Sequence, residues 1–162
     1  MALDVDVVLA NPRLSAGTFR NVHIMYLQGE MFVPELQQAF AAQRSLIEEY
    51  GDQTASLAII APVTPLPSSD NRRVSTEMLR EVGPQLKCSA MVLLGTGFWA
   101  SAVRSAVTAI FAIARQPCQV KVFAEPEPAS RWLAPFVTQA GDDVAHAAKV
   151  VVAAAEEQAR SA

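Results

Sequence analysis

The sequence predicts an α/β fold in which a mixed, mostly parallel sheet of four to five strands begins with a β-hairpin and continues through crossover helices. Short apolar runs typical of buried strands alternate with longer segments whose apolar residues recur at helical spacing. In addition, 51% of the 162 residues are hydrophobic, which is ample for one packed core. Alternation of this kind favours parallel strands joined by helices that cross over the sheet.

The N-terminal part predicts a hairpin followed by a strong helix. Val5–Leu9 and Val22–Leu27 are expected to pair antiparallel, because the segment 11–17 between them is rich in turn-forming residues. Pro34 suits the first helical position, where its missing N–H would be unpaired in any case. Gly51 then supplies a C-terminal stop to that helix.

The central part predicts two buried strands with a helix between them. Leu57–Ala61 and Ala90–Leu94 are continuous apolar runs, as expected of strands covered on both faces of a parallel sheet. Ser68 is well placed to cap a helix from Ser69 to Val82, and Asp70 is favourable in its first turn.

The C-terminal part predicts three more helices and one more strand. An apolar helix covers Phe98–Ala114, the last strand covers Val120–Phe123, and a further helix covers Glu127–Gln139. Asp143–Arg160 has high helix propensity but few large apolar groups. We therefore expect an α/β domain over residues 1–140 and a C-terminal helical extension over residues 141–162.

Two segments resemble STAS-like domains, which are relatives of bacterial anti-sigma-factor antagonists. The segments are GTGFWASAVRSAVTAIFAIARQPCQVKVFAEPEPASRWL and SSDNRRVSTEMLREV, and the likeness in pattern and order extends over roughly residues 5–136. The resemblance implies a four- to five-stranded sheet with helices mainly on one side. It also implies a role in binding partner proteins or small ligands.

The same resemblance implies a phosphorylation site at the start of the second helix. In phospho-regulated members a serine stands at that helix N-terminus, and Ser68 and Ser69 occupy the matching place, without the family's preceding aspartate. The helix dipole would stabilise the added negative charge, and Arg72 and Arg73 could pair with it. The alternative interpretation is an ordinary helix cap beside a solvated basic pair.

A second candidate site is the turn Gly95-Thr96-Gly97, which follows a predicted strand and opens a helix. With Ala100 it forms a G-x-G-x-x-A pattern, typical of a turn that approaches a pyrophosphate. The alternative function is therefore a small-ligand or nucleotide-binding sensor using the turn Gly95–Ala100. Only one strand follows this turn, however, so half of a dinucleotide-binding sheet would be missing.

The helix Phe98–Ala114 is apolar nearly all round, and this predicts either an external contact or burial beneath the C-terminal extension. The external contact would be a homodimer, a partner protein or a lipid-like surface. Its candidate residues are Trp99, Val103, Arg104, Ile110 and Phe111.

Charge and composition exclude several function classes. The 13 basic residues are spread along the chain and are outnumbered by 16 acidic ones, for a net charge of −3, which argues against a nucleic-acid partner. The N-terminus lacks the pattern of a secretory signal. The longest apolar stretch is short and carries Arg104, so no stable membrane insertion is expected. These features favour the cytoplasm.

Catalytic patterns find little support in the sequence. His23 and His146 are far apart, and no cluster of carboxylates, histidines or cysteines has metal-ligand spacing. We therefore expect no catalytic residues, no metal and no cofactor. The leading hypothesis is a non-catalytic, STAS-like regulatory or protein-interaction module that contacts a partner protein, with control by phosphorylation left open beside the ordinary helix cap.

Overall fold

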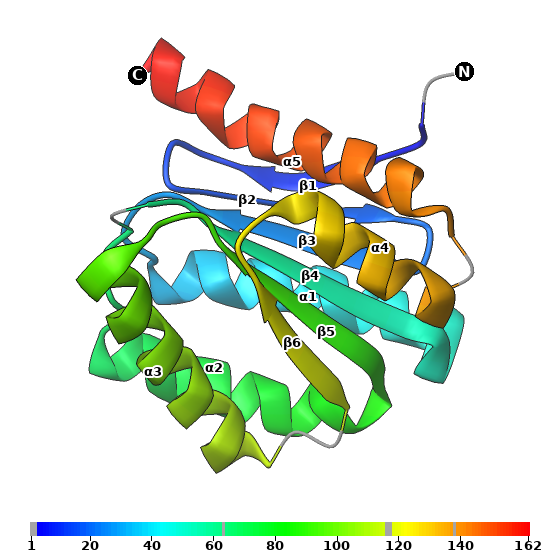
Figure 1. Ribbon diagram of the computed structural model, residues 1–162, viewed down its shortest axis with the longest axis horizontal. Coiled ribbons are helices and arrows are strands. Elements are labelled where there is room, and N and C mark those ends of the chain that lie inside the picture. Colours follow the sequence, from blue (N-terminus) through cyan, green and yellow to red (C-terminus); the bar gives the residue numbers. More distant parts are fainter. Residues whose placement is uncertain (1–2, 63, 116–117, 138) are drawn as a thin grey trace.

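The computed structural model describes residues 3–62, 64–115, 118–137 and 139–162, which form three layers (Figure 1). One six-stranded sheet, in the order β1-β2-β3-β4-β5-β6, lies between two helical layers. Its strands are β1 (Asp6–Ala10), β2 (Leu14–Phe19), β3 (Val22–Leu27), β4 (Thr54–Ile60), β5 (Leu86–Leu93) and β6 (Gln119–Phe123). The helices are α1 (Val33–Tyr50), α2 (Ser69–Val82), α3 (Gly97–Ala114), α4 (Pro126–Val137) and α5 (Gly141–Ser161).

The direction of the strands changes once across the sheet. Strands β1, β2 and β3 pair antiparallel, whereas β3, β4, β5 and β6 pair parallel. Each parallel step moves the chain one position in the same direction, so right-handed crossovers place α1, α2 and α3 on one face. Helices α4 and α5 cover the other face (Figure 1). The predicted α/β fold with a mixed sheet is confirmed at this level.

The sheet has one strand that the sequence analysis assigned to a turn. The predicted turn residues Ser15, Ala16 and Gly17 form half of β2, so the prediction that Val22–Leu27 pairs with the first strand was wrong: β3 pairs with β2 and β4. The small residues of β2 serve close packing. A Cβ on Gly17 would lie 3.0 Å from Val151 Cγ2, and Ser15 donates a 2.6 Å hydrogen bond to the carbonyl of Val151.

Helix α5 is part of the same core as the sheet. Its buried residues Val144, Ala147, Val151 and Ala155 belong to one continuous apolar cluster with β3, β4, β5 and α4. Alanines on this helix let its axis approach the strands, and the segment 141–162 therefore shares a core with the rest of the chain. The helices cover both faces of the sheet, which differs from the one-sided arrangement that the resemblance implied.

Candidate functional site

A cavity of about 120 Å³ lies between the sheet and the layer formed by α1, α2 and α3. The register of the strands explains its position. Met25, Ala58 and Met91 stand side by side on β3, β4 and β5, on the face opposite the continuous core. The single methyl group of Ala58 leaves space between the two flanking methionines. Helix α2 packs on α1 and α3, and its residues Ser75 and Leu79 line the cavity from the helical layer.

One end of the cavity carries a row of polar side chains. His23, Ser56 and Ser89 are Cα partners on three neighbouring parallel strands and line the same cavity. Neighbouring strands lie about 4.8 Å apart, so these three side chains are adjacent. Gln43 reaches the cavity from α1, one helical turn after Ala39.

The imidazole of His23 is buried, with 3% of its surface exposed, and is held in one orientation. It is hydrogen-bonded to the backbone of Ala39, while its Nε2 has no partner. Burial lowers the pKa of His23 to about 4, and the bond to Ala39 opposes that shift only in part. At neutral pH the ring is therefore uncharged. With Nδ1–H donating to the Ala39 carbonyl, Nε2 presents a lone pair.

Gln43 supplies a second unpaired acceptor. Gln43 is 2% exposed, and its side-chain Oε1 has no hydrogen-bond partner within the part of the chain that is described. A buried polar atom without a partner costs about 1–3 kcal/mol. Two such acceptors, His23 Nε2 and Gln43 Oε1, therefore favour a hydrogen-bond donor inside the cavity.

Apart from Thr64 and Ser75, the rest of the described wall is apolar, and it is uncharged. Among the described residues that line the cavity, none is Asp, Glu, Lys or Arg. Met31, Thr64, Pro65 and Pro67 come from the loops that follow β3 and β4. These loops lie at the carboxyl ends of parallel strands, where ligands enter open α/β sheets.

The predicted phosphorylation site lies at the beginning of α2. Ser68 caps this helix by accepting a 3.1 Å hydrogen bond from the backbone N–H of Asn71, and Ser69 is exposed. Arg72 is exposed one turn further on. Arg73 forms a 3.1 Å ion pair with Glu77, which directs it away from the serines.

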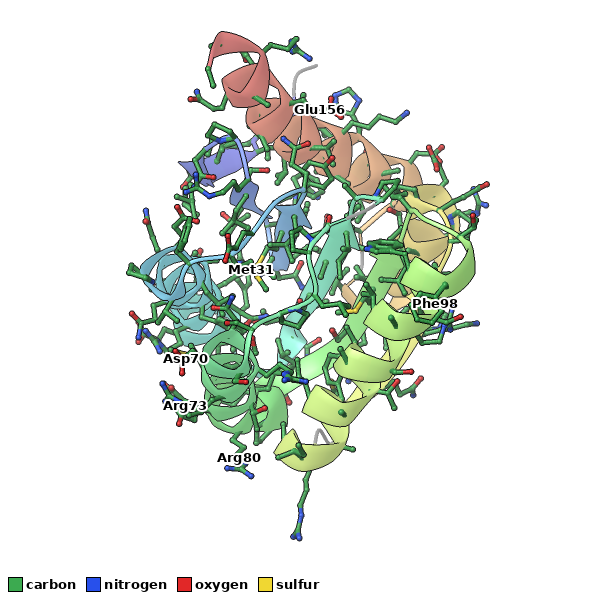
Figure 2. The ribbon with its side chains drawn as sticks, turned by 90° about the vertical axis from the view of Figure 1, so that its left-hand side faces the viewer. Met31, Asp70, Arg73, Arg80, Phe98 and Glu156 are labelled. Carbon is green, nitrogen blue, oxygen red and sulfur yellow. The ribbon has the colours of Figure 1, made fainter. Side chains whose placement is uncertain are left out.

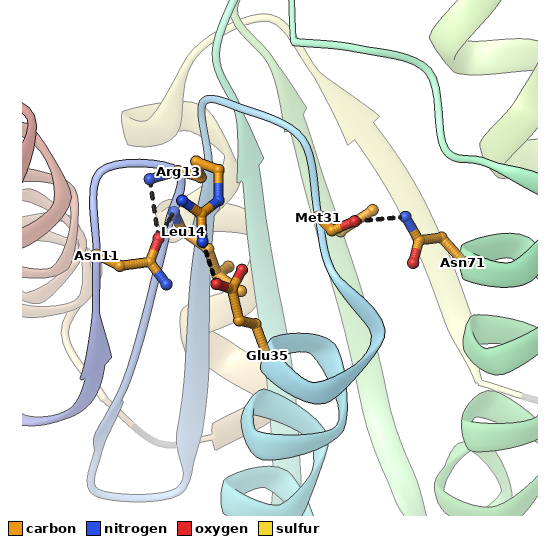
Figure 3. A network of polar contacts seen from close by, with 6 residues as sticks. All are labelled: Asn11, Arg13, Leu14, Met31, Glu35 and Asn71. Carbon is orange, nitrogen blue, oxygen red and sulfur yellow. Dashed lines mark hydrogen bonds and ion pairs between the residues drawn. The ribbon is translucent and has the colours of Figure 1, made fainter.

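Asn71 connects the start of α2 to the rim of the cavity. Its buried side-chain amide donates a 2.8 Å hydrogen bond to the carbonyl of Met31, a residue that lines the cavity (Figure 3). The same figure shows the ion pair between Arg13 and Glu35, which joins the β1–β2 loop to the first turn of α1. The N-terminal ends of both helices are thus tied to neighbouring loops.

The predicted nucleotide-binding turn has a structural explanation. A Cβ on Gly95 would overlap the indole ring of Trp99, and the indole Nε1–H donates a 2.8 Å hydrogen bond to the Thr64 carbonyl. The close approach that Gly95 permits is therefore to a side chain of α3, the helix that follows it. Gly97 has a φ of +70°, which glycine adopts without strain, and Thr96 makes no side-chain capping bond.

The predicted interface residues of α3 mostly point inward. Val103 and Ile110 are buried, with 3% and 9% of their surfaces exposed, and Phe111 lines the cavity beside them. Trp99 packs with Val103, whereas Ile110 and Phe111 pack in a second cluster with Leu79 and Ala114. Residues 99, 103, 110 and 111 fall on one broad helical stripe, so they contact the sheet and α2 from the same side of α3.

The outer side of α3 has a different set of residues. Phe98 is 90% exposed at the start of the helix (Figure 2). Ile113 is 56% exposed, and among the predicted interface residues only Arg104 is exposed. By length and composition α3 would also suffice to cross a membrane, with a mean hydropathy of 1.4.

The polar row was missed by sequence reasoning. His23 was interpreted as an ordinary hydrogen-bonded strand residue, and Ser56, Ser89 and Gln43 were not singled out. The available signal was a polar residue near the start of each of these three strands, two positions before a residue of the apolar row Met25, Ala58 and Met91. His146, the other histidine, is exposed on α5 and does not join this site.

Comparisons of the chain with protein-family models, with curated proteins and with solved structures gave no match. Within the described residues, no three His, Cys, Asp or Glu side chains gather as a metal site would require. The cavity and its polar row are therefore the features from which a function has to be argued.

Proposed function

We propose that the chain is a non-catalytic regulatory module that binds a small, mainly apolar molecule in the cavity beneath α1, α2 and α3. The observation that carries the proposal is an uncharged apolar cavity with two buried, unpaired acceptors, His23 Nε2 and Gln43 Oε1. Apolar pockets with a few convergent polar groups are the usual form of small-molecule sites. The volume of about 120 Å³ approaches that of an apolar cavity of about 150 Å³ known to take up benzene.

Binding explains the polar row better than catalysis does. Ser56 stands beside His23, an arrangement that could suggest an activated hydroxyl. A histidine whose pKa lies at about 4 is a weak base at neutral pH, however, and its ring bonds to a backbone carbonyl in place of a carboxylate. A neutral imidazole held in this way is suited to accepting a hydrogen bond from a ligand.

A substitution that fills the cavity tests this proposal. Ala58→Leu places three more carbon atoms between Met25 and Met91, so it should abolish the thermal stabilisation that small ring compounds such as phenol give to the original protein. Ala41→Leu, on the exposed side of α1, is the matched control and should keep that stabilisation. Circular dichroism checks that both variants fold. A cavity-filled variant that still gains stability from phenol would contradict the proposal, as would an original protein that gains none.

A second candidate function, contact with a partner protein under the control of phosphorylation, is favoured by the position of Ser68 and Ser69. Both are exposed at the start of α2, and Arg72 is exposed within one turn of them. Asp70, Arg73 and Arg80 lie along the outer side of the same helix, and Phe98 lies on α3 (Figure 2). The Asn71–Met31 bond would link a change at this helix start to the cavity.

Phosphopeptide mapping tests this second candidate. The chain, purified from the cells that produce it, should carry phosphate on Ser68 or Ser69. The Ser68→Ala/Ser69→Ala double variant, purified in parallel, should lack it. A chain without phosphate at either serine in all growth conditions would remove the argument for phospho-regulation and leave the cavity proposal intact.

A further inference from the structure

The polar end of the cavity constrains the chemistry of what can bind there. Resting on the proposed function, we infer that the cavity selects neutral ring compounds that carry a hydroxyl or N–H donor, such as phenols and cyclic alcohols. Carboxylates and plain hydrocarbons should bind less well. The inference follows from the kind of hydrogen-bonding atom, the absence of charge and the shape of the wall.

The first step concerns the direction of hydrogen bonding. Because the His23 ring donates to the Ala39 carbonyl through one nitrogen, its other nitrogen, Nε2, can only accept. Gln43 Oε1 is likewise an acceptor, and it lies one helical turn beyond Ala39. A ligand hydroxyl or N–H can donate to either of these atoms. A ligand that only accepts would leave both of these atoms unpaired and could bond only to hydroxyl or amide donors of the lining, such as Ser56 and Ser89.

The second step concerns charge. A carboxylate transferred from water into an apolar site needs a cation or several donors to replace its hydration. The described residues lining the cavity include no Lys or Arg, and the imidazole is uncharged at neutral pH. The donors of the lining are neutral hydroxyl and amide groups, including those of Ser56 and Ser89, and they do not supply a positive charge. Anionic ligands are therefore disfavoured.

The third step concerns shape. The volume of about 120 Å³ matches one six-membered ring more closely than a long acyl chain. Phe40 and Phe111 line the cavity from α1 and α3, and aromatic side chains pack well against a flat ring. The flexible thioethers of Met25 and Met91 can adjust to a ring of either planar or puckered shape.

Isothermal titration at pH 7.5 with four probes tests the inference. Phenol and cyclohexanol should bind the full chain at least about tenfold more tightly than benzene, because they pair a buried acceptor. Benzoate should show no measurable binding. If none of the four probes binds, the proposed function itself fails. If benzene binds as tightly as phenol, or benzoate binds best, the site takes up small molecules but the inferred selectivity is wrong.

Two variants locate the acceptor. His23→Asn keeps an amide nitrogen near the position of Nδ1, where it can still donate to Ala39, and removes the distal acceptor. Gln43→Met removes the other acceptor with little change in length. At least one of them should reduce the preference for phenol over benzene to about twofold or less. Gln38→Met, an exposed change on the same helix, should leave the preference unchanged. If both variants keep the original preference, neither His23 Nε2 nor Gln43 Oε1 accepts a hydrogen bond from the ligand, and the inference is overturned.

Discussion

The imidazole of His23 is buried in the folded chain, and its burial makes the stability of the fold depend on pH. Its pKa in the folded chain is about 4, below the value of 6.5 for a free imidazole. Between these two values the unfolded chain binds more protons than the folded one, so the folded state loses stability as the pH falls from about 6.5 to about 4. For a shift of this size the total loss is about 3 kcal/mol.

Urea denaturation at pH 7.5, 6 and 5 measures this effect. The free energy of unfolding of the original chain should fall more steeply with acidification than that of His23→Asn, which has no imidazole to protonate. The difference between the two proteins isolates His23 from the carboxyl groups that titrate in the same range. Parallel pH profiles for the two proteins would mean that folding does not lower the pKa of His23 and would contradict this prediction.

The close packing of Trp99, in the first turns of α3, requires a glycine at position 95. A Cβ there would overlap the Trp99 ring, so Gly95→Ala should displace the indole, weaken its hydrogen bond to Thr64 and destabilise the fold by about 1–3 kcal/mol. The midpoint of urea unfolding measures the loss. Thr96→Ala is the control, since this exposed side chain makes no capping bond, and it should change stability by less than about 0.5 kcal/mol. Equal stability of the two variants would contradict the packing argument.

The residues of the candidate site could be predicted from the sequence only in part. Ser68 was identified as a helix cap because capping is a local property, and the structure confirms the bond to Asn71. The row formed by His23, Ser56 and Ser89 depends on the register between three strands that are distant in the sequence. Local patterns contain no information about that register, so these residues could not be assembled into one site.

At the scale of elements, strands with a local signal were predicted, and the strand that depends on a distant contact was missed. Apolar runs predict β4 and β5, whereas β2 contains Ser15 and Gly17, which are typical of turns. These small residues are favourable in β2 because α5 lies against them, more than 130 positions later in the chain. A tertiary contact thus overrides the local preference.

The contact between β2 and α5 makes the last helix necessary for folding. Deleting residues 141–162 would expose the buried faces of β2 and β3 and leave the Ser15 hydroxyl without its partner on Val151. We expect the shortened chain to aggregate or to lose its cooperative thermal transition, as followed by circular dichroism. Removing only residues 158–162, which are exposed, should change the transition by little. A shortened chain that melts cooperatively near the original temperature would show that α5 is a dispensable extension.

At the scale of the whole molecule, the two faces of the sheet are packed differently. The face under α4 and α5 forms one continuous apolar cluster, which includes Phe19, Leu57 and Leu133. The face under α1, α2 and α3 is divided into four smaller clusters arranged around the cavity. Because close packing resists local opening, the second face should be the less stable one.

Hydrogen–deuterium exchange tests this asymmetry and connects it to function. Backbone amides of α2 and α3 should exchange faster than those of α5, since they belong to the smaller clusters. A saturating concentration of phenol should slow exchange in α2 and α3 and leave α5 unchanged, because a ligand in the cavity bridges the sheet and the helices above it. The Ala58→Leu variant should show the slower exchange without ligand. Equal exchange rates in the two helical layers would contradict this difference in packing. They would also contradict the expectation that a ligand changes the surface formed by α2 and α3.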